Sequence, residues 1–187
     1  MTALDPQADR RWQTRDILVV AVIAVAFGVF FWAFGLVWAG LTFLGPAQSV
    51  LYAGWLLPAI VAPLLVRKPG AAIFAELVAA FVSMFLGSQW AIDTLLSGLL
   101  QGGAAELVFA AAGYRRYDLP VVVAASMAAT TAAFVHDWAI YYRDYATEAL
   151  LAIAVAMAIS GAIVLPLAAL AIERAVRRSG ALPEPIP

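Results

Sequence analysis

Two acidic residues lie inside long apolar stretches of this chain, where a carboxylate would do chemistry or stabilise the fold. Glu76 and Glu106 are these residues. A charged side chain within a membrane is costly unless it faces a cavity or pairs with another group. The two glutamates are therefore predicted either to form a structural pair, hydrogen-bonded to neighbouring helices, or to lie beneath a substrate cavity.

The spacing of the two glutamates from nearby basic residues places them at one depth. Glu76 follows Lys68 by eight residues, and Glu106 precedes Arg115 by nine. At about 1.5 Å per helical residue, both carboxylates lie about 12–14 Å from the basic ends of adjacent helices. Two acidic groups at the same depth favour a shared polar region inside the protein.

A polar stripe precedes Glu106 on the same predicted helix. Asp93, Ser97 and Gln101 follow one another at intervals of four residues. Residues at this spacing share one face of an α-helix. The stripe predicts a helix face that lines a cavity or, as the alternative, one that forms hydrogen bonds with a neighbouring helix.

Aromatic residues gather in two predicted connections on the opposite side from the basic residues. Trp90 belongs to the first of these, and His136, Trp138 and Tyr141 belong to the second. Such rings form the aromatic belt of many membrane proteins, which requires no ligand. Aromatic faces combined with polar groups also bind flat heterocycles, including cationic ones.

The composition identifies an integral membrane protein. Of 187 residues, 65% are hydrophobic and 12% are charged, whereas a soluble domain has about 25% charged residues. The chain has no cysteine, one histidine and a net charge of −1. These counts exclude disulfides, thiolate sites and multi-histidine metal sites, and no block of like charges indicates nucleic acid binding. We expect no cofactor and, without a catalytic constellation, no enzymatic activity.

The apolar runs predict an all-α protein that forms a single membrane domain over residues 1–187. The six transmembrane helices are expected at about 17–36, 50–66, 71–86, 95–113, 119–135 and 149–172. Ten of the eleven basic residues, Arg10 among them, lie at the N-terminus or on alternate connections and ends. The positive-inside rule then places both termini in the cytoplasm of a multi-pass protein in the cell membrane.

Small residues and prolines predict details of helix packing. Ala24 and Gly28 have the spacing that lets helices approach closely, either within the chain or against a partner subunit. The second and sixth predicted helices contain Pro58, Pro63 and Pro166. We expect both helices to be distorted, as is common around internal cavities.

The middle of the chain combines six short motifs: RKPGAA at 67–72, AE at 75–76, GSQW at 87–90, SGLLQG at 97–102, ELVF at 106–109 and YRRY at 114–117. With this combination the chain resembles the YkoE family, the substrate-binding S components of energy-coupling factor (ECF) transporters. The resemblance is densest over residues 55–120, and the length and six-helix layout are similar throughout. The family pattern has proline before the tryptophan and glycine after it, where this chain has Gln89 and Ala91.

The resemblance implies a protein that captures thiamin or its hydroxymethylpyrimidine precursor from the extracellular side and works with a T component and cytoplasmic ATPases. Combining this with depth, we expect Glu76, Gln101 and Glu106 beneath the ligand. The residues expected to close the site are Trp90, His136, Trp138 and Tyr141.

Related S components use small residues of the first helix to contact the T component, which makes Ala24 and Gly28 candidates for that contact. Two alternatives to the hypothesis of a thiamin-binding S component remain open. One is a self-sufficient small-solute carrier or channel. The other is an S component for a different heterocyclic vitamin.

Overall fold

The computed structural model describes residues 11–180, so Arg10 of the predicted basic cluster lies outside the described residues. Over this range the chain is helical and has no strand. The elements in order are α1 (Thr14–Gly40), the 3₁₀-helix η2 (Thr42–Leu56), α2 (Leu57–Val66), α3 (Ala71–Phe85), α4 (Asp93–Ala111), α5 (Leu119–Ile140), α6 (Thr147–Ile159), the π-helix η3 (Ser160–Val164) and α7 (Leu165–Arg178).

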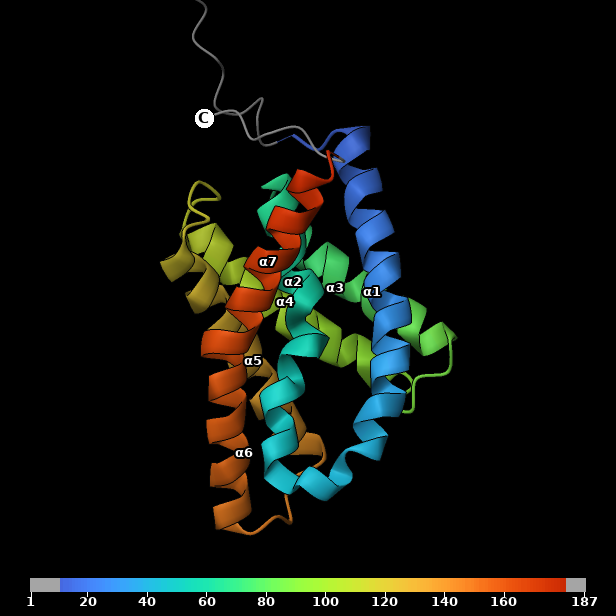
Figure 1. The fold of residues 1–187 in the computed structure, drawn as a ribbon, viewed down its shortest axis with the longest axis vertical. Helices are drawn as coiled ribbons and strands as arrows, with labels where there is room; N and C mark the ends of the chain where they lie inside the picture. Colours follow the sequence, from blue (N-terminus) through green and yellow to red (C-terminus); the bar gives the residue numbers. More distant parts are fainter. Residues whose placement is uncertain (1–10, 181–187) are drawn as a thin grey trace, which may run out of the picture.

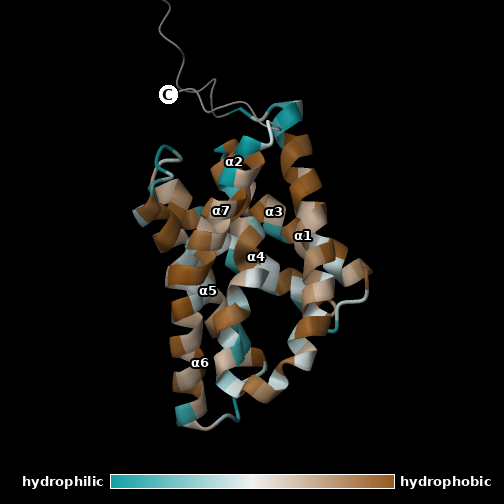
Figure 2. Cartoon of the chain, in the orientation of Figure 1, coloured by the Kyte–Doolittle hydropathy of each residue, from teal (hydrophilic) through white to brown (hydrophobic). Residues whose placement is uncertain are grey.

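The helices have the length and composition of membrane spans. Five continuous segments within residues 11–180 are long and apolar enough to cross a membrane, and α3 is a shorter apolar helix. Hydrophobic residues run along α1 and α6, and hydrophilic residues gather toward the ends of the molecule (Figure 2). The expected fold class, an all-α membrane protein with six helices, is confirmed.

The second span lies at the centre of the bundle. α1 runs along one edge and α6 with α7 along the other, with η2 and α2 between them (Figure 1). Every residue of α2 from Leu57 to Leu65 is buried. The start of α1 and the end of α7 lie at the same end of the molecule (Figure 1). The opposite end carries the turn into η2 and the connection from α5 to α6.

Two of the prolines of the second and sixth spans, Pro58 and Pro166, lie where the helix type changes. η2 gives way to α2 at Leu57, next to Pro58, and the π-helix η3 ends immediately before Leu165 and Pro166. Proline has no N–H, and its ring crowds the carbonyl four residues earlier. A wider π turn before Pro166 relieves this crowding.

The fifth helix is longer than the sequence predicted. We expected an outer connection over 136–148, but α5 continues to Ile140 and carries His136 and Asp137 as buried residues. Their polar side chains are compatible with a buried helix because each has hydrogen-bond partners within the protein. A polar sequence at this point thus marks an internal site and not the end of the helix.

The small residues of α1 pack inside the chain, which is one of the two placements that their spacing left open. Ala24 has no exposed surface, and Gly28 is also buried. A Cβ at Gly28 would lie 2.5 Å from Cβ of Val82 and 2.8 Å from the carbonyl oxygen of Ala79, both on α3. The close approach that the spacing predicted therefore joins α1 to α3.

Candidate substrate-binding site

A cavity of about 210 Å³ lies between α1, η2, α3, α4 and the end of α5. Seven of the fifteen residues that line it are aromatic. The aromatic residues that line it are Phe31, Trp38, Tyr52, Trp55, Trp90, Tyr141 and Tyr142.

Trp55 is the centre of the aromatic wall. Its ring packs against that of Trp90 with the centroids 5.1 Å apart and the planes at 83°. It also contacts Phe31, with centroids 5.3 Å apart, and Trp38, with centroids 6.2 Å apart. Edge-to-face packing of this kind orients the rings firmly. The wall is thus a preformed surface for a flat apolar group.

Glu76 of α3 supplies an unpaired oxygen to the cavity. The residue is only 1% exposed, and it lines the cavity. Oε2 accepts a hydrogen bond from the backbone N–H of Ala59 at 2.9 Å, which is one of the free N–H groups in the first turn of α2. Oε1 is buried and has no partner. A ligand with an N–H donor would satisfy this oxygen.

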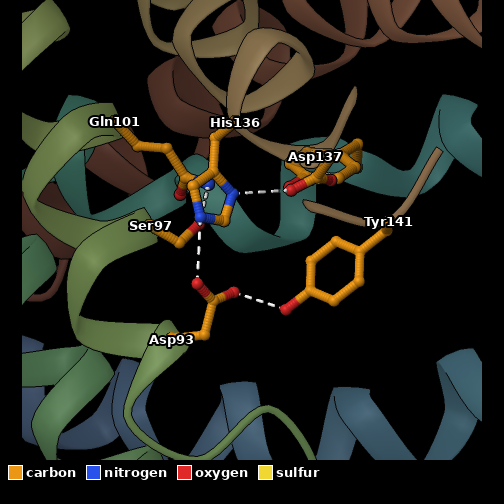
Figure 3. Close-up of polar contacts among 7 residues, drawn as sticks. Asp93, Ser97, Gln101, His136, Asp137 and Tyr141 are labelled. Carbon is orange, nitrogen blue, oxygen red and sulfur yellow. Dashed lines mark hydrogen bonds and ion pairs between the residues drawn. The ribbon is translucent and has the colours of Figure 1, made fainter. Parts of the chain in front are cut away.

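The predicted polar stripe of α4 faces the same cavity. Asp93, Ser97 and Gln101 all line it, and the close-up in Figure 3 shows them along one helix. Nε2 of Gln101 donates to Oγ of Ser97 at 2.5 Å. This face of α4 lines a cavity, one of the two interpretations left open by the sequence.

A chain of polar contacts connects α4 to α5 at the edge of the cavity (Figure 3), and it continues to η2. Nε2 of His136 lies 3.1 Å from Oδ1 of Asp93, and Nδ1 lies 3.0 Å from Oδ1 of Asp137. The hydroxyl of Tyr52 donates to Oδ2 of Asp137 at 2.7 Å. The hydroxyl of Tyr141 donates to Asp93. Both tyrosine protons are therefore directed to carboxylates.

The two tyrosines after α5 stay protonated over a wide pH range. Burial raises the pKa of Tyr141 well above its usual range, and the hydrogen bond to Asp93 raises it further. Burial likewise raises the pKa of Tyr142 well above its usual range, with a further contribution from Asp137. The rings therefore contribute hydroxyl groups and not phenolates to the wall of the cavity.

Glu106 lies outside the cavity lining and supports the backbone instead. Its Oε1 accepts from the N–H of Gly70 at 2.6 Å, and its Oε2 accepts from the N–H of Ala72 at 2.9 Å. These groups belong to the first turn of α3, where N–H groups lack helical partners. Of the two glutamates placed at one depth, only Glu76 lines the cavity.

The structure brings together four of the seven residues expected at the substrate. Trp90, Glu76, Gln101 and Tyr141 line the cavity. His136 lies behind the lining and holds two carboxylates, whereas Glu106 caps α3. The last of the seven, Trp138, is 48% exposed and is not part of the lining.

Several residues reach the cavity although the sequence did not single them out as site residues. Tyr52 and Trp55 come from η2, and Trp38 and Phe31 come from α1. Aromatic residues near helix ends are equally typical of an interfacial belt, since belts and binding walls have the same composition. The signal that separates the two is proximity to the buried carboxylates, which requires the fold.

The ionisable side chains that line the cavity include three carboxylic acids and no basic group among the described residues. Asp93, Asp137 and Glu76 line it, whereas no lysine or arginine does so among residues 11–180. Within the same range, no group of three or more His, Cys, Asp or Glu residues is placed to hold a metal ion. Aromatic rings and carboxylates together attract an organic cation.

The chain is similar to known transport proteins. A profile of the family described as ABC-type cobalt transport system, permease component, matches residues 15–132. A protein of Bacillus subtilis (strain 168) named as the HMP/thiamine permease protein YkoE is 34% identical over 178 residues, covering 92% of this chain and 88% of that protein. The chain belongs to the YkoE family.

A solved structure supports the same assignment. The crystal structure of an S-component of an ECF transporter matches with a TM-score of 0.86 and 31% identity, covering 91% of this chain and 88% of the other. Both relatives are named as transport proteins. The YkoE-family chain described here is accordingly a multi-pass membrane protein of the S-component type and not an enzyme.

Proposed function

We propose that this YkoE-family protein is the substrate-capture subunit of an ECF importer and binds thiamin or hydroxymethylpyrimidine from the extracellular side. The observation that carries the proposal is the buried Oε1 of Glu76, which has no partner and lies in a cavity with an aromatic wall. The amino group of the pyrimidine is a donor for this oxygen. The name of the related YkoE protein mentions HMP and thiamine, which supports the same ligands.

In this proposal each half of thiamin binds a different part of the cavity. The aminopyrimidine would pair with Glu76 and Gln101 on one side. The thiazolium, whose positive charge is permanent, would lie against the aromatic rings near Asp93 and Asp137. Cation–π attraction and nearby carboxylates both favour a charged ring in a desolvated site. Hydroxymethylpyrimidine would use the first of these places only.

Transport requires an energy source outside this chain. We place both termini and the basic connections on the cytoplasmic side, since the exposed arginines of the described residues include Arg15, Arg115 and Arg178. A T component and ATP-binding subunits would associate with the subunit and drive ligand release. Uptake by vesicles that contain the purified chain alone would contradict this and favour a self-sufficient carrier.

Titration of the detergent-purified protein with thiamin and with hydroxymethylpyrimidine tests the proposal. Trp38, Trp55 and Trp90 line the cavity, so their fluorescence should be quenched saturably by submicromolar ligand. Trp90→Phe should reduce this quenching, whereas Trp138→Phe should not, because Trp138 lies outside the cavity lining. No response to either compound by folded protein would refute the proposed ligands.

Cobalt is the second candidate ligand because of the description of the matching family. The arrangement of the described residues gives it less support, since no three potential metal ligands come together among them. Adding Co²⁺ to the same titration distinguishes the two. Quenching by Co²⁺ that thiamin does not displace would favour the metal.

A further inference from the structure

His136 lies behind the wall of the cavity and connects two acidic residues that face the ligand space. Its side chain is 3% exposed, and it is absent from the cavity lining. Each ring nitrogen lies within hydrogen-bond distance of a carboxylate oxygen, Nε2 at Asp93 and Nδ1 at Asp137. His136 is also the only histidine of the chain.

The number of protons shared by Asp93, His136 and Asp137 follows from their geometry. A hydrogen bond at each ring nitrogen requires one proton in each of the two contacts. A neutral imidazole carries only one, so the three groups together hold one proton more than a neutral ring between two carboxylates. Their total charge is then −1, because the tyrosine hydroxyls that donate to Asp93 and Asp137 are neutral.

The surroundings determine where the additional proton resides. The ionisable groups against the ring are Asp93 on α4, Asp137 on α5 and the ring of Tyr141, 6.3 Å away between centroids. Tyr52 of η2 lies beyond Asp137. Two carboxylates close together in an apolar site share a proton unless a cation lies between them. The His136 ring occupies that place.

We propose that His136 is a specificity-determining residue that, as an imidazolium, keeps both Asp93 and Asp137 ionised toward the cavity. The positive charge lies behind the wall, and the two negative charges lie on it. The cavity then prefers a ligand with a permanent positive charge over an uncharged ligand of the same shape. This inference rests on the proposed function, since it concerns the choice between charged and neutral ligands of the same site.

The test compares thiamin with its uncharged analogue in which a thiophene replaces the thiazolium. The wild-type protein should bind thiamin more tightly than the analogue. In His136→Gln the amide has no charge, so one of the two aspartates takes up a proton. The preference for thiamin should then fall about tenfold, with the loss confined mainly to the charged ligand.

A second variant separates charge from folding. In the double variant His136→Gln, Asp137→Asn an uncharged amide replaces one of the two carboxylates. The preference of this protein for thiamin should therefore equal that of His136→Gln. Equal losses of affinity for thiamin and for the analogue in both variants would show a purely structural role and overturn the proposal. A preference that rises in His136→Gln would overturn it as well.

A measurement without ligand tests the charge directly. With ¹⁵N-labelled histidine, the wild-type protein gives signals from a single ring. A doubly protonated ring has two nitrogen shifts close together at neutral pH, as we expect, whereas a neutral ring has two widely separated shifts and would overturn the proposal. If folded protein binds neither thiamin nor hydroxymethylpyrimidine, the proposed function fails, while this readout still decides the state of His136.

Discussion

Glu76 and Glu106 lie on neighbouring helices, and both are nearly completely buried, yet they belong to two different regions of the molecule. Around Glu76 the helices separate to form a cavity with an aromatic wall. Around Glu106 the carboxylate fills the space at the start of α3 and accepts two backbone hydrogen bonds. One glutamate has an oxygen available for a ligand, and the other has none.

The difference shows that depth in a membrane does not determine what a buried carboxylate does. Each glutamate binds the first turn of a helix, Glu76 at α2 and Glu106 at α3, where free N–H groups stabilise negative charge. Only the number of such groups within reach differs. A single N–H leaves Glu76 half satisfied, and this unsatisfied half faces the cavity.

Replacing Glu106 should have the largest effect on stability. Glu106→Ala removes two hydrogen bonds to a charged group, each contributing about 1.5–3 kcal/mol, and leaves two buried N–H groups unpaired. We expect the free energy of unfolding to fall by about 3 kcal/mol or more, measured by denaturation in detergent. Glu148→Ala, at an exposed position, is the control and should change little. A stable Glu106→Ala protein would contradict the distinction between the two glutamates.

Replacing Glu76 should have the largest effect on binding. In Glu76→Gln an amide NH2 group takes the place of one carboxylate oxygen. This group cannot accept a hydrogen bond from an N–H donor of the ligand. Loss of a hydrogen bond to a charged group costs about 1.5–3 kcal/mol, so affinity for thiamin should fall at least about tenfold in the fluorescence titration. Glu106→Gln should keep the wild-type affinity in the protein that remains folded. The opposite result would exchange the roles of the two residues.

A smaller effect is expected where α1 meets α3 in the packed region. Gly28→Ala places a methyl group 2.5 Å from Cβ of Val82, and overpacking of this kind costs about 1–3 kcal/mol. Gly103→Ala on α4 is the matched control because nothing lies within 4 Å of the added carbon. A Gly28→Ala protein that keeps the thermal stability of the wild type but no longer associates with a T component would contradict this expectation. It would favour the partner contact expected from the sequence.

Hydropathy and length were sufficient to predict the membrane class and the six-helix fold, because an apolar run of this length has few other stable states. The extension of α5 was not predictable in this way. Polar residues such as His136 and Asp137 are typical of a connection in sequence. Their burial depends on Tyr52 and Asp93, which are distant in the chain and approach only in the folded protein.

The candidate site was predictable in composition but not in detail. The stripe of Asp93, Ser97 and Gln101 follows from helical periodicity alone, and it faces the cavity. Which of Glu76 and Glu106 lines the cavity depends on which helix start each carboxylate reaches. That relation is set by the packing of α2, α3 and α4 and leaves no local pattern in the sequence.

The shortness of α3 has a consequence for the surrounding lipid. Its 15 residues extend about 22 Å at about 1.5 Å per residue, whereas the hydrocarbon core of a bilayer is about 30 Å thick. A span that is too short is accommodated by a thinner bilayer beside it, so we expect the headgroup layer to lie closer to the bilayer centre next to α3. Such thinning costs only a fraction of a kcal/mol per Å, so the lipid beside α3 is expected to adapt to the protein.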